Sequence, residues 1–518
     1  MALLDQYIKE IEKELTIKPK TKMSADEIGE VIEIKDEVIT LSGLDNVAYG
    51  ELIRFDNGVW AMVIDMLPAE VGAIVLGDYL KIKSGDIAKA TGNTLSIPVS
   101  DDLLGRVVNP LAEPLDKASK IKSVKMNPIE KVAPGVIYRK QVSESLQTGI
   151  KSVDALVAIG RGQREIIIGD RGVGKTTIAL DTILNQKGQN VVCIYCAIGQ
   201  KNSKVANTIE LLRTHEALPY SIVVSASASD PATMQYLAPY SACAIAEYFM
   251  DKGQDVLIVY DDLSKHAWAY RQISLILRRP AGREAYPGDV FYLHSRLLER
   301  AARRDEKYGG GSITALPIVE TLEGDVSAYI PTNIISITDG QIVLDGDLFN
   351  AGMRPAINVG LSVSRVGGAA QAKAMKQVAG KLKLDLAQYR ELSAFSQFES
   401  DLDPETKKFL NRGAKITQIL KQDKHNTYDL ASEVAIIWAA TKGYLDELTI
   451  PQVEEFEKKY LEDLQLRGKS LLKRINEKRI LEEKEEQELK KFVTDNLPSP
   501  EVTSSIDQHE SSDSPKKN

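Results

Sequence analysis

Hydrophobic residues change their spacing along this chain, which predicts regions of different architecture. In residues 1–26 they recur at helical spacing, which predicts a short amphipathic N-terminal helix. Its apolar stripe either docks on a partner or covers the first domain. In residues 27–98 short apolar runs alternate with Gly, Asn and Asp, which predicts a small β-barrel or sandwich. The expected strands are 29–34, 38–41, 51–55, 59–67 and 72–76.

Strands and helical stretches alternate through residues 99–372, which predicts a parallel sheet with crossover helices. Residues 373–495 follow a helical pattern, and we interpret their charged run at 478–491 as the solvated face of a helix. Residues 496–518 are rich in Ser, Pro, Asp and Glu, a composition typical of a disordered tail. The expected strands of the sheet are 165–168, 191–197, 221–226, 255–260 and 312–318.

Composition and charge narrow the class of protein. The chain has 518 residues, a length that suits about three domains, and its formal net charge of −8 argues against a dedicated nucleic-acid binder. Three cysteines are too few for a disulfide framework and fit a reducing cytosol. The first residues lack the layout of a signal peptide. We expect the longest uncharged stretch, 231–246, to be a buried helix or turn, so that any membrane role comes through partners.

One stretch of the sequence matches a known binding motif. Residues 169–176 match G-x-x-x-x-G-K-[ST] in full, after a β-branched run and before a good helical continuation. In such a phosphate-binding loop the glycines let backbone N–H groups point at one anion, the lysine reaches the β- and γ-phosphates, and the hydroxyl ligates Mg²⁺. We therefore expect ATP or ADP with Mg²⁺. The predicted nucleotide-binding residues are Gly169, Asp170, Arg171, Gly172, Val173, Gly174, Lys175, Thr176 and Thr177, with Thr176 also a metal ligand.

A second element of the same site follows downstream. Residues 256–260 form an apolar run that ends in Asp261 and Asp262. An apolar strand that ends in acid has the form of a Walker B element, whose first Asp holds Mg²⁺ through its water shell. We therefore predict that Asp261 belongs to the nucleotide and metal site.

Other candidate sites are interpreted as structural. Cys193 and Cys196 have redox or zinc spacing, but they fall inside an expected strand, where residues three apart point to opposite faces. The five histidines show no metal-ligand spacing. Gly309, Gly310 and Gly311 are interpreted as a flexible loop tip and not as a second phosphate site.

Several long motifs closely resemble the alpha subunits of the F-type ATP synthase head, and the resemblance covers residues 27–492. It implies a multidomain fold with an N-terminal β-barrel, a central α/β P-loop (RecA-like) nucleotide-binding domain and a C-terminal α-helical domain. The motifs are Tyr-Asp-Asp-Leu-Ser-Lys at 260–265, Arg-Arg-Pro at 278–280, Gly-Arg-Glu-Ala-Tyr-Pro-Gly-Asp-Val at 282–290, Pro-Thr-Asn-Ile-Ile-Ser-Ile-Thr-Asp-Gly-Gln at 331–341 and Ser-Val-Ser-Arg-Val-Gly-Gly-Ala-Ala-Gln at 362–371.

The resemblance also implies partners and a place in the cell. In that family three alpha and three beta subunits alternate in a ring around the central gamma stalk, and nucleotides bind at the subunit interfaces. We expect the same partners here, with the delta subunit or the peripheral stalk at the N-terminus. The expected location is peripheral, on the cytoplasmic face of a bacterial cell membrane, in a proton-translocating complex that touches the membrane only through other subunits.

Two residues indicate the alpha type of subunit. Beta subunits carry a catalytic Glu where this chain has Gln200, which cannot accept a proton as a carboxylate does. Because some GTPases use a Gln to position water, Gln200 alone does not decide the matter. Arg365, in the Ser-Arg-Val-Gly-Gly motif, matches the alpha residue that reaches into the neighbouring beta site as an arginine finger. The resemblance therefore implies a regulatory subunit that binds nucleotide and, alone, is not catalytic.

The chain departs from the family at two points of the nucleotide site. Gly172 and Val173 stand where most alpha subunits have Gln and Thr, which removes a side-chain donor, and restoring that pair is expected to slow nucleotide release. In the adenine pocket Gln422 is kept, but Lys424 replaces a second glutamine. Affinity and base specificity therefore stay open. The other predicted nucleotide-binding residues are Arg354 and Pro355.

The sequence leaves two functions open. The first is the alpha subunit of a proton-translocating ATP synthase. The second is an alpha-like subunit of a specialised rotary-type ATPase motor, of the kind found in wall-less bacteria, which fits the altered loop and the polar tail. A stand-alone hexameric ATPase or transcription terminator is disfavoured by the acidic charge and by the lack of an aromatic RNA-binding surface. The coupling ion, proton or sodium, also stays open.

Overall fold

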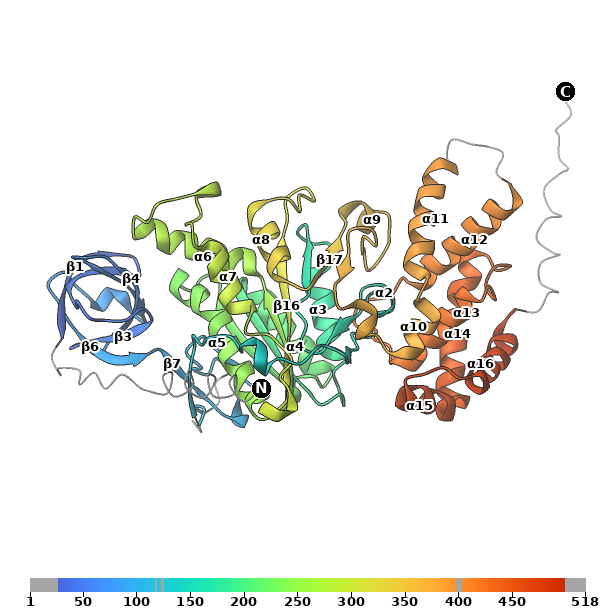
Figure 1. Ribbon diagram of the computed structural model, residues 1–518, viewed down its shortest axis with the longest axis horizontal. Helices are drawn as coiled ribbons and strands as arrows, with labels where there is room; N and C mark the ends of the chain where they lie inside the picture. The colour runs from blue at the N-terminus through green and yellow to red at the C-terminus, as the bar shows by residue number, and fades with distance from the viewer. Residues whose placement is uncertain (1–26, 117–118, 123–124, 397–402, 499–518) are drawn as a thin grey trace, which may run out of the picture. The chain divides into compact units, whose positions relative to one another are not determined.

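A computed structural model describes residues 27–116, 119–122, 125–396 and 403–498 of the chain (Figure 1). The expected N-terminal helix (1–26) and all but the first three residues of the expected tail (496–518) lie outside these described residues. The chain divides into two compact units. One contains residues up to Ser96 together with Gln272–Arg279, and the other contains the rest.

The first unit contains a closed six-stranded barrel with the strand order β1-β2-β5-β4-β3-β6. Burial alternates along β3, where Ile53 and Phe55 are buried and Arg54 between them is exposed. This alternation fills the barrel with apolar side chains and confirms the expected β-barrel. The strands are β1 (Ile28–Lys35), β2 (Val38–Gly43), β3 (Glu51–Phe55), β4 (Trp60–Met66), β5 (Val71–Leu76) and β6 (Ile87–Thr94).

The second unit is organised around an eight-stranded sheet with the order β18-β17-β12-β16-β15-β13-β14-β8. Neighbouring strands are parallel except for the antiparallel pair β17 and β18. Short strand pairs β7–β9 and β10–β11 lie outside the main sheet. The strands are β7 (Ser96–Val99), β8 (Val107–Val108), β9 (Lys125–Pro128), β10 (Ser145–Leu146), β11 (Ile159–Gly160), β12 (Ile166–Gly169), β13 (Val191–Gln200), β14 (Ser221–Ser227), β15 (Asp255–Asp261), β16 (Ser312–Glu320), β17 (Gly340–Leu344) and β18 (Val363–Ser364).

Helices cover this sheet, as a parallel arrangement requires. Helices α3 and α4 share a hydrophobic core with β13 and its neighbours, and α5 packs against β13 to β16. The uncharged stretch 231–246 lies mostly in α5, which is buried, and no helix of the described residues is long and apolar enough to cross a membrane. The helices are α2 (Lys151–Leu156), α3 (Lys175–Leu184), α4 (Asn202–Thr214), α5 (Ala232–Asp251), α6 (Leu263–Ile276), α7 (Val290–Leu298), α8 (Tyr329–Ile337) and α9 (Gly346–Asn350).

The C-terminal region is helical, as expected, and its core is continuous with that of the sheet. Buried residues of α10, α12, α13, α14, α15 and α16 belong to the same hydrophobic cluster as those of α3 and β12. This continuity fixes the segment after α12 relative to the phosphate-binding loop. The helices are α10 (Lys373–Ala379), α11 (Leu382–Ser396), α12 (Pro404–Ile419), α13 (Leu430–Thr441), α14 (Ile450–Arg467), α15 (Lys469–Lys478) and α16 (Glu483–Asn496).

The charged run 478–491 is mostly exposed to solvent, as interpreted from the sequence, but it belongs to two helices. It spans the end of α15 and the start of α16, and Arg479 between them has φ of +53°, which ends the first helix. Glu485 is buried and forms ion pairs with Arg474 and Lys478. Glu485 is therefore the exception in a run whose other charged side chains are exposed or half-buried.

The two cysteines with metal-like spacing are structural, as interpreted. Cys193 and Cys196 both lie in β13, are free and are fully buried. Burial raises the pKa of the Cys193 thiol far above its ordinary value, so that it stays protonated.

Candidate nucleotide-binding site

The phosphate-binding loop joins the end of β12 to the start of α3, so its backbone N–H groups lie at a helix N-terminus. Gly172 and Gly174 have φ of +88° and +106°, in the left-handed region that side chains rarely adopt. A Cβ at either glycine would meet no atom within 4 Å, so backbone conformation and not space requires them. The loop therefore combines the curled backbone and the helix dipole that bind an anion.

Lys175, the lysine of this loop, is turned toward the loop itself. Its Nζ donates hydrogen bonds to the carbonyl oxygens of Gly169 at 2.7 Å and of Asp170 at 2.6 Å. Burial lowers the pKa of Lys175, and nearby carboxylates, with Glu320 first, oppose this effect. A buried ammonium group held over the loop is suited to offset the charge of a phosphate.

Asp170 and Arg171, two further residues of the loop, have different surroundings. Asp170 Oδ1 accepts hydrogen bonds from Thr321 Oγ1 at 2.6 Å and from the backbone N–H of Gly324 at 2.9 Å. This carboxylate therefore braces the loop against the segment after β16. Arg171 is exposed, and its side chain makes no hydrogen bond or ion pair with other described residues.

The end of β15 brings Asp261 against the start of α3. Asp261 Oδ2 accepts hydrogen bonds from Thr176 Oγ1 at 2.8 Å and from Tyr195 Oη at 2.7 Å. Lys204 Nζ, from α4, lies 3.4 Å from the same oxygen. The two predicted magnesium ligands, Thr176 and Asp261, thus present their oxygens at one point. A hydroxyl and a carboxylate fit Mg²⁺, which binds through oxygen ligands of this kind together with nucleotide phosphates.

Gln200 ends β13 and contacts both Asp261, the last residue of β15, and Asp262, which follows it. Its Nε2 donates hydrogen bonds to Asp261 Oδ1 at 2.7 Å and to Asp262 Oδ2 at 3.3 Å. Burial raises the pKa of Asp262 to about 6, while the ion-paired Lys265 acts in the opposite direction. Gln200 therefore serves as a neutral donor that holds the aspartates, and its amide cannot take a proton from water.

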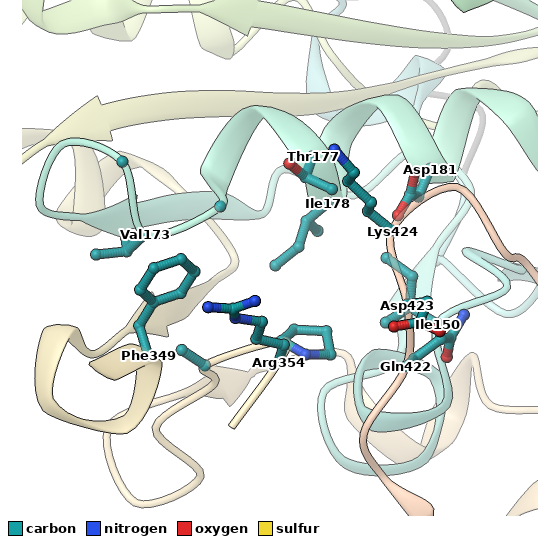
Figure 2. Close-up of a pocket in the computed structure, with 14 residues that line it drawn as sticks. Ile150, Val173, Thr177, Ile178, Asp181, Phe349, Arg354, Gln422, Asp423 and Lys424 are labelled. Carbon is teal, nitrogen blue, oxygen red and sulfur yellow. The ribbon is translucent and has the colours of Figure 1, made fainter. Parts of the chain in front are cut away.

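A cavity of about 410 Å³ opens beside the loop and is bounded by the segment after α12 (Figure 2). Its size suits one small ligand. Gly169, Asp170, Arg171, Lys175, Thr176, Gln200 and Asp261 do not line it. The predicted residues that do line it are Gly172, Val173, Gly174, Thr177, Arg354, Pro355, Gln422 and Lys424. The other lining residues are Ile150, Ile178, Asp181, Phe349, Ala356 and Asp423.

Phe349 is an aromatic wall of this cavity that the sequence did not reveal. It lies at the end of α9, and the guanidinium carbon of Arg354 is 4.8 Å from the centroid of its ring. Figure 2 shows the ring and the guanidinium group on the same side of the cavity. Both are flat surfaces on which a base can stack. No motif marks Phe349, because only the fold brings the end of α9 to the loop.

Gln422 lines the cavity with its amide already hydrogen-bonded to backbone. Its Nε2 donates to the carbonyl oxygens of Gly149 and Asn426, each at 2.7 Å. Its Oε1 accepts a hydrogen bond from the backbone N–H of Lys151 at 3.0 Å. Gln422 therefore fixes the shape of the cavity by joining the loop before α2 to the segment after α12.

Opposite charges meet at another edge of the cavity. Figure 2 shows Lys424 extending toward Thr177, the residue with which the predicted loop ends. Asp181 lies one turn further along α3, and its Oδ1 is 2.8 Å from Nδ1 of His425. Burial raises the pKa of Asp181, and His425 acts in the opposite direction. An amine at position 424 therefore gives this edge a positive group that a second glutamine would not supply.

Arg365 lies away from this cavity, directly after β18 and just before the turn at Gly367. Its backbone N–H donates to the carbonyl oxygen of Asp339 at 2.8 Å. Its side chain is exposed and, within the described part of the chain, makes no hydrogen bond or ion pair. It borders a separate hollow of about 360 Å³. The other basic residues of that hollow are all ion-paired: Arg139 with Glu299, Lys140 with Glu306, Arg164 with Asp339, and Arg303 with Glu144.

The fold and the site together define a P-loop nucleotide-binding protein, in which the cavity beside the loop is completed by the segment after α12. Comparison with protein families agrees over three regions. Residues 25–92 match the beta-barrel domain of the ATP synthase alpha/beta family, residues 149–364 match its nucleotide-binding domain, and residues 371–496 match the C-terminal domain of the ATP synthase alpha/beta chain.

Comparison with individual proteins finds a relative that is named as an alpha subunit. The ATP synthase subunit alpha of Dehalococcoides mccartyi is 55% identical over 474 residues, which cover 91% of this chain and 94% of the relative. The chain therefore belongs to the ATP synthase alpha/beta family, and its resemblance to alpha subunits is confirmed.

Proposed function

We propose that this chain is the nucleotide-binding, regulatory alpha subunit of a rotary ATP synthase head, and that it binds ATP or ADP with Mg²⁺. The observation that carries this proposal is a complete phosphate-binding loop that opens on the cavity of Figure 2, with Gln200 beside the paired aspartates. The loop would hold the phosphates and the cavity would hold the base. Thr176 and Asp261 would hold the metal ion, which supplies charge to neutralise the phosphates.

The second part of the proposal concerns Arg365. We infer that it enters the catalytic site of a neighbouring beta subunit, which supplies the carboxylate that Gln200 cannot. A guanidinium group stays charged and presents donors in a planar fork. It stabilises the charge that spreads over the γ-phosphoryl oxygens in the transition state, and it does so only when the interface is closed. Its exposed and unpaired state in the described residues supports this role.

The proposed assembly has three copies of this chain alternating with three beta subunits around a gamma stalk. The N-terminal segment would contact the delta subunit or the peripheral stalk, and the complex would lie on the cytoplasmic face of the bacterial cell membrane. The name of the relative from Dehalococcoides mccartyi supports this setting. A specialised rotary motor is the second candidate, and the changed loop positions Gly172 and Val173, with the polar tail, favour it.

Two measurements on the full-length chain test the proposal. ATP binding should be readily detected by calorimetry, while steady-state hydrolysis should appear only after a beta subunit is added. Robust turnover by the chain alone would refute the non-catalytic role. Proteins that copurify with the complex distinguish the two candidates, because proton-channel and b-type stalk subunits indicate a synthase, and motility or surface proteins indicate a motor.

A further inference from the structure

Lys204 places an ammonium group among the oxygens of the proposed metal site. Its Nζ lies 3.1 Å from Thr176 Oγ1, 3.1 Å from Gln200 Oε1 and 3.4 Å from Asp261 Oδ2. These oxygens come from three elements, since Thr176 is in α3, Gln200 ends β13 and Asp261 ends β15. No motif marks Lys204, which lies in the first turn of α4, just after Gln200 ends β13.

The chemistry of this cluster matches an ammonium ion. A lysine ammonium has three N–H donors and no acceptor, and the three oxygens provide one acceptor for each donor. Two of the same oxygens, on Thr176 and Asp261, are the proposed magnesium ligands. Mg²⁺ needs its ligands at about 2.0–2.1 Å and repels a neighbouring positive charge. The Lys204 ammonium and Mg²⁺ therefore compete for one position.

The charges around this position are balanced by the chain itself. The lysines are Lys175, Lys204 and Lys265, and the carboxylates that act on them are Asp261, Asp262 and Glu320. The side chain of Lys204 is 43% exposed, whereas that of Asp261 is 2% exposed. Because the Lys204 side chain is partly exposed, its ammonium group can move from the Asp261 carboxylate to a phosphate oxygen without being pulled out of the protein core.

We propose that Lys204 is a built-in cation of this site, so that the chain binds ATP nearly as well without Mg²⁺ as with it. The inference rests on the nucleotide binding proposed above. In the absence of metal, Lys204 neutralises phosphate charge alongside Lys175. In its presence, Lys204 must give up the oxygens of Thr176 and Asp261, so the metal adds little net affinity.

The test is ATP binding by the full-length chain, measured by calorimetry in a magnesium buffer and in EDTA. For the unchanged chain, the two dissociation constants should agree within about threefold. Lys204→Thr should bind roughly ten- to a hundredfold more weakly in EDTA than in magnesium, the factor expected for the loss of one charge-assisted hydrogen bond. Lys204→Arg keeps the charge and should behave like the unchanged chain.

A matched control and a direct metal readout accompany this test. Lys201→Thr removes a lysine that is exposed and that makes no side-chain contact with other described residues. The ratio of its ATP dissociation constants in EDTA and in magnesium should therefore equal that of the unchanged chain. The electron paramagnetic resonance signal of Mn²⁺ added with ADP reports metal in the site. Lys204→Thr should bind more Mn²⁺ than the unchanged chain at the same concentrations.

The outcomes separate this inference from the function on which it rests. Equal magnesium dependence in the unchanged chain and in Lys204→Thr, with normal binding, would overturn the role of Lys204 alone. A chain that binds ATP in neither buffer would overturn the proposed nucleotide binding, and the inference with it. Melting curves of each variant show whether a loss of binding reflects unfolding. In that case the unchanged chain decides the matter, because dissociation constants that differ more than tenfold between magnesium and EDTA would overturn the inference.

Discussion

The proposed phosphate and metal site and the Arg365 surface differ in how their charges are satisfied. At the proposed phosphate and metal site, the central charged groups find partners within the chain: Lys175 donates to backbone carbonyls, and Asp261 accepts from Thr176 and Tyr195. Arg365 is exposed and its side chain makes no hydrogen bond or ion pair within the described residues, although its charge acts on the buried Glu165 and the basic residues around it are ion-paired. The first site is organised by one chain. The second presents a guanidinium group that is available to an anion of another subunit.

The largest expected effect comes from removing that guanidinium group. Arg365→Ala should lower the turnover of the ring assembled with a beta subunit by roughly 10³-fold or more, the lower end of what arginine fingers supply in other NTPases. ATP affinity at this chain's own cavity should stay unchanged, because Arg365 does not line it. Arg365→Lys should restore little, since a point charge lacks the planar fork.

Lys140→Ala is the matched control, because Lys140 borders the same hollow but is held in a surface ion pair with Glu306. Surface pairs of this kind contribute little, so turnover should stay near normal. Near-normal turnover of an assembled Arg365→Ala ring would remove the difference between the two sites, since Arg365 would then have no role in catalysis.

The next largest effect is expected at the phosphate-binding loop. Lys175→Ala should weaken ATP binding at least roughly 100-fold, because it removes a charge-assisted contact to phosphate in a buried setting. Calorimetry on the full-length chain measures the loss. Lys187→Ala, which removes an exposed lysine paired with Glu216, serves as the control and should bind normally. Binding that survives in Lys175→Ala would mean that the loop backbone alone holds the phosphates.

The fold was largely predictable because its strongest patterns are local. The strands β12, β13 and β15 are continuous apolar runs that end in Gly or in polar residues, and the loop after β12 matches a complete motif. The strands that escaped prediction are β6 to β11, β17 and β18. β8, β10, β11 and β18 have two residues each, and β6 exposes much of its surface, so their sequence carries little signal.

The site was predicted less completely, because its contacts join residues far apart in the sequence. The motifs identified Lys175, Thr176 and Asp261. No motif identified Phe349, which reaches the cavity from α9, or Lys204, which reaches Asp261 from α4. Such residues act through positions that only the packed sheet and helices determine.

A smaller effect is expected at Gly172, where sequence and structure suggest different results. A glutamine there adds a donor, but Gly172 has φ of +88°. Gly172→Gln should weaken ATP binding about tenfold, because a side chain in the left-handed region costs roughly 1–3 kcal/mol. Val173→Thr should change binding little, since Val173 is buried and the two side chains are similar in volume. Slower nucleotide release from Gly172→Gln would show that the loop adapts and that the donor matters more.

The smallest effect concerns two buried carboxyl groups, those of Asp154 and Glu433, which stabilise the loop next to the cavity. Asp154, in α2, accepts hydrogen bonds from the backbone N–H groups of Thr148 at 3.0 Å and of Gly149 at 2.9 Å. It thereby holds the loop that Gln422 also contacts. Burial raises the pKa of Asp154 to about 6. Burial, and then the neighbouring Asp154, raise the pKa of Glu433 on α13 well above its ordinary value.

Both raised pKa values mean that the folded chain binds more protons than the unfolded chain, so the free energy of unfolding falls as pH rises above about 4 and through 6.

Glu433→Gln removes one of the two ionisations while keeping a similar shape. At pH 8 it should raise the melting temperature by about 2–4 °C, the change expected for roughly 1 kcal/mol in a domain of this size. Near pH 4, where the unfolded carboxyl group is also largely protonated, the two melting temperatures should converge. Calorimetric scans of the full-length chain across this pH range measure the difference. Parallel curves would show that Glu433 gains no proton on folding and that the pair is not the internal support inferred here.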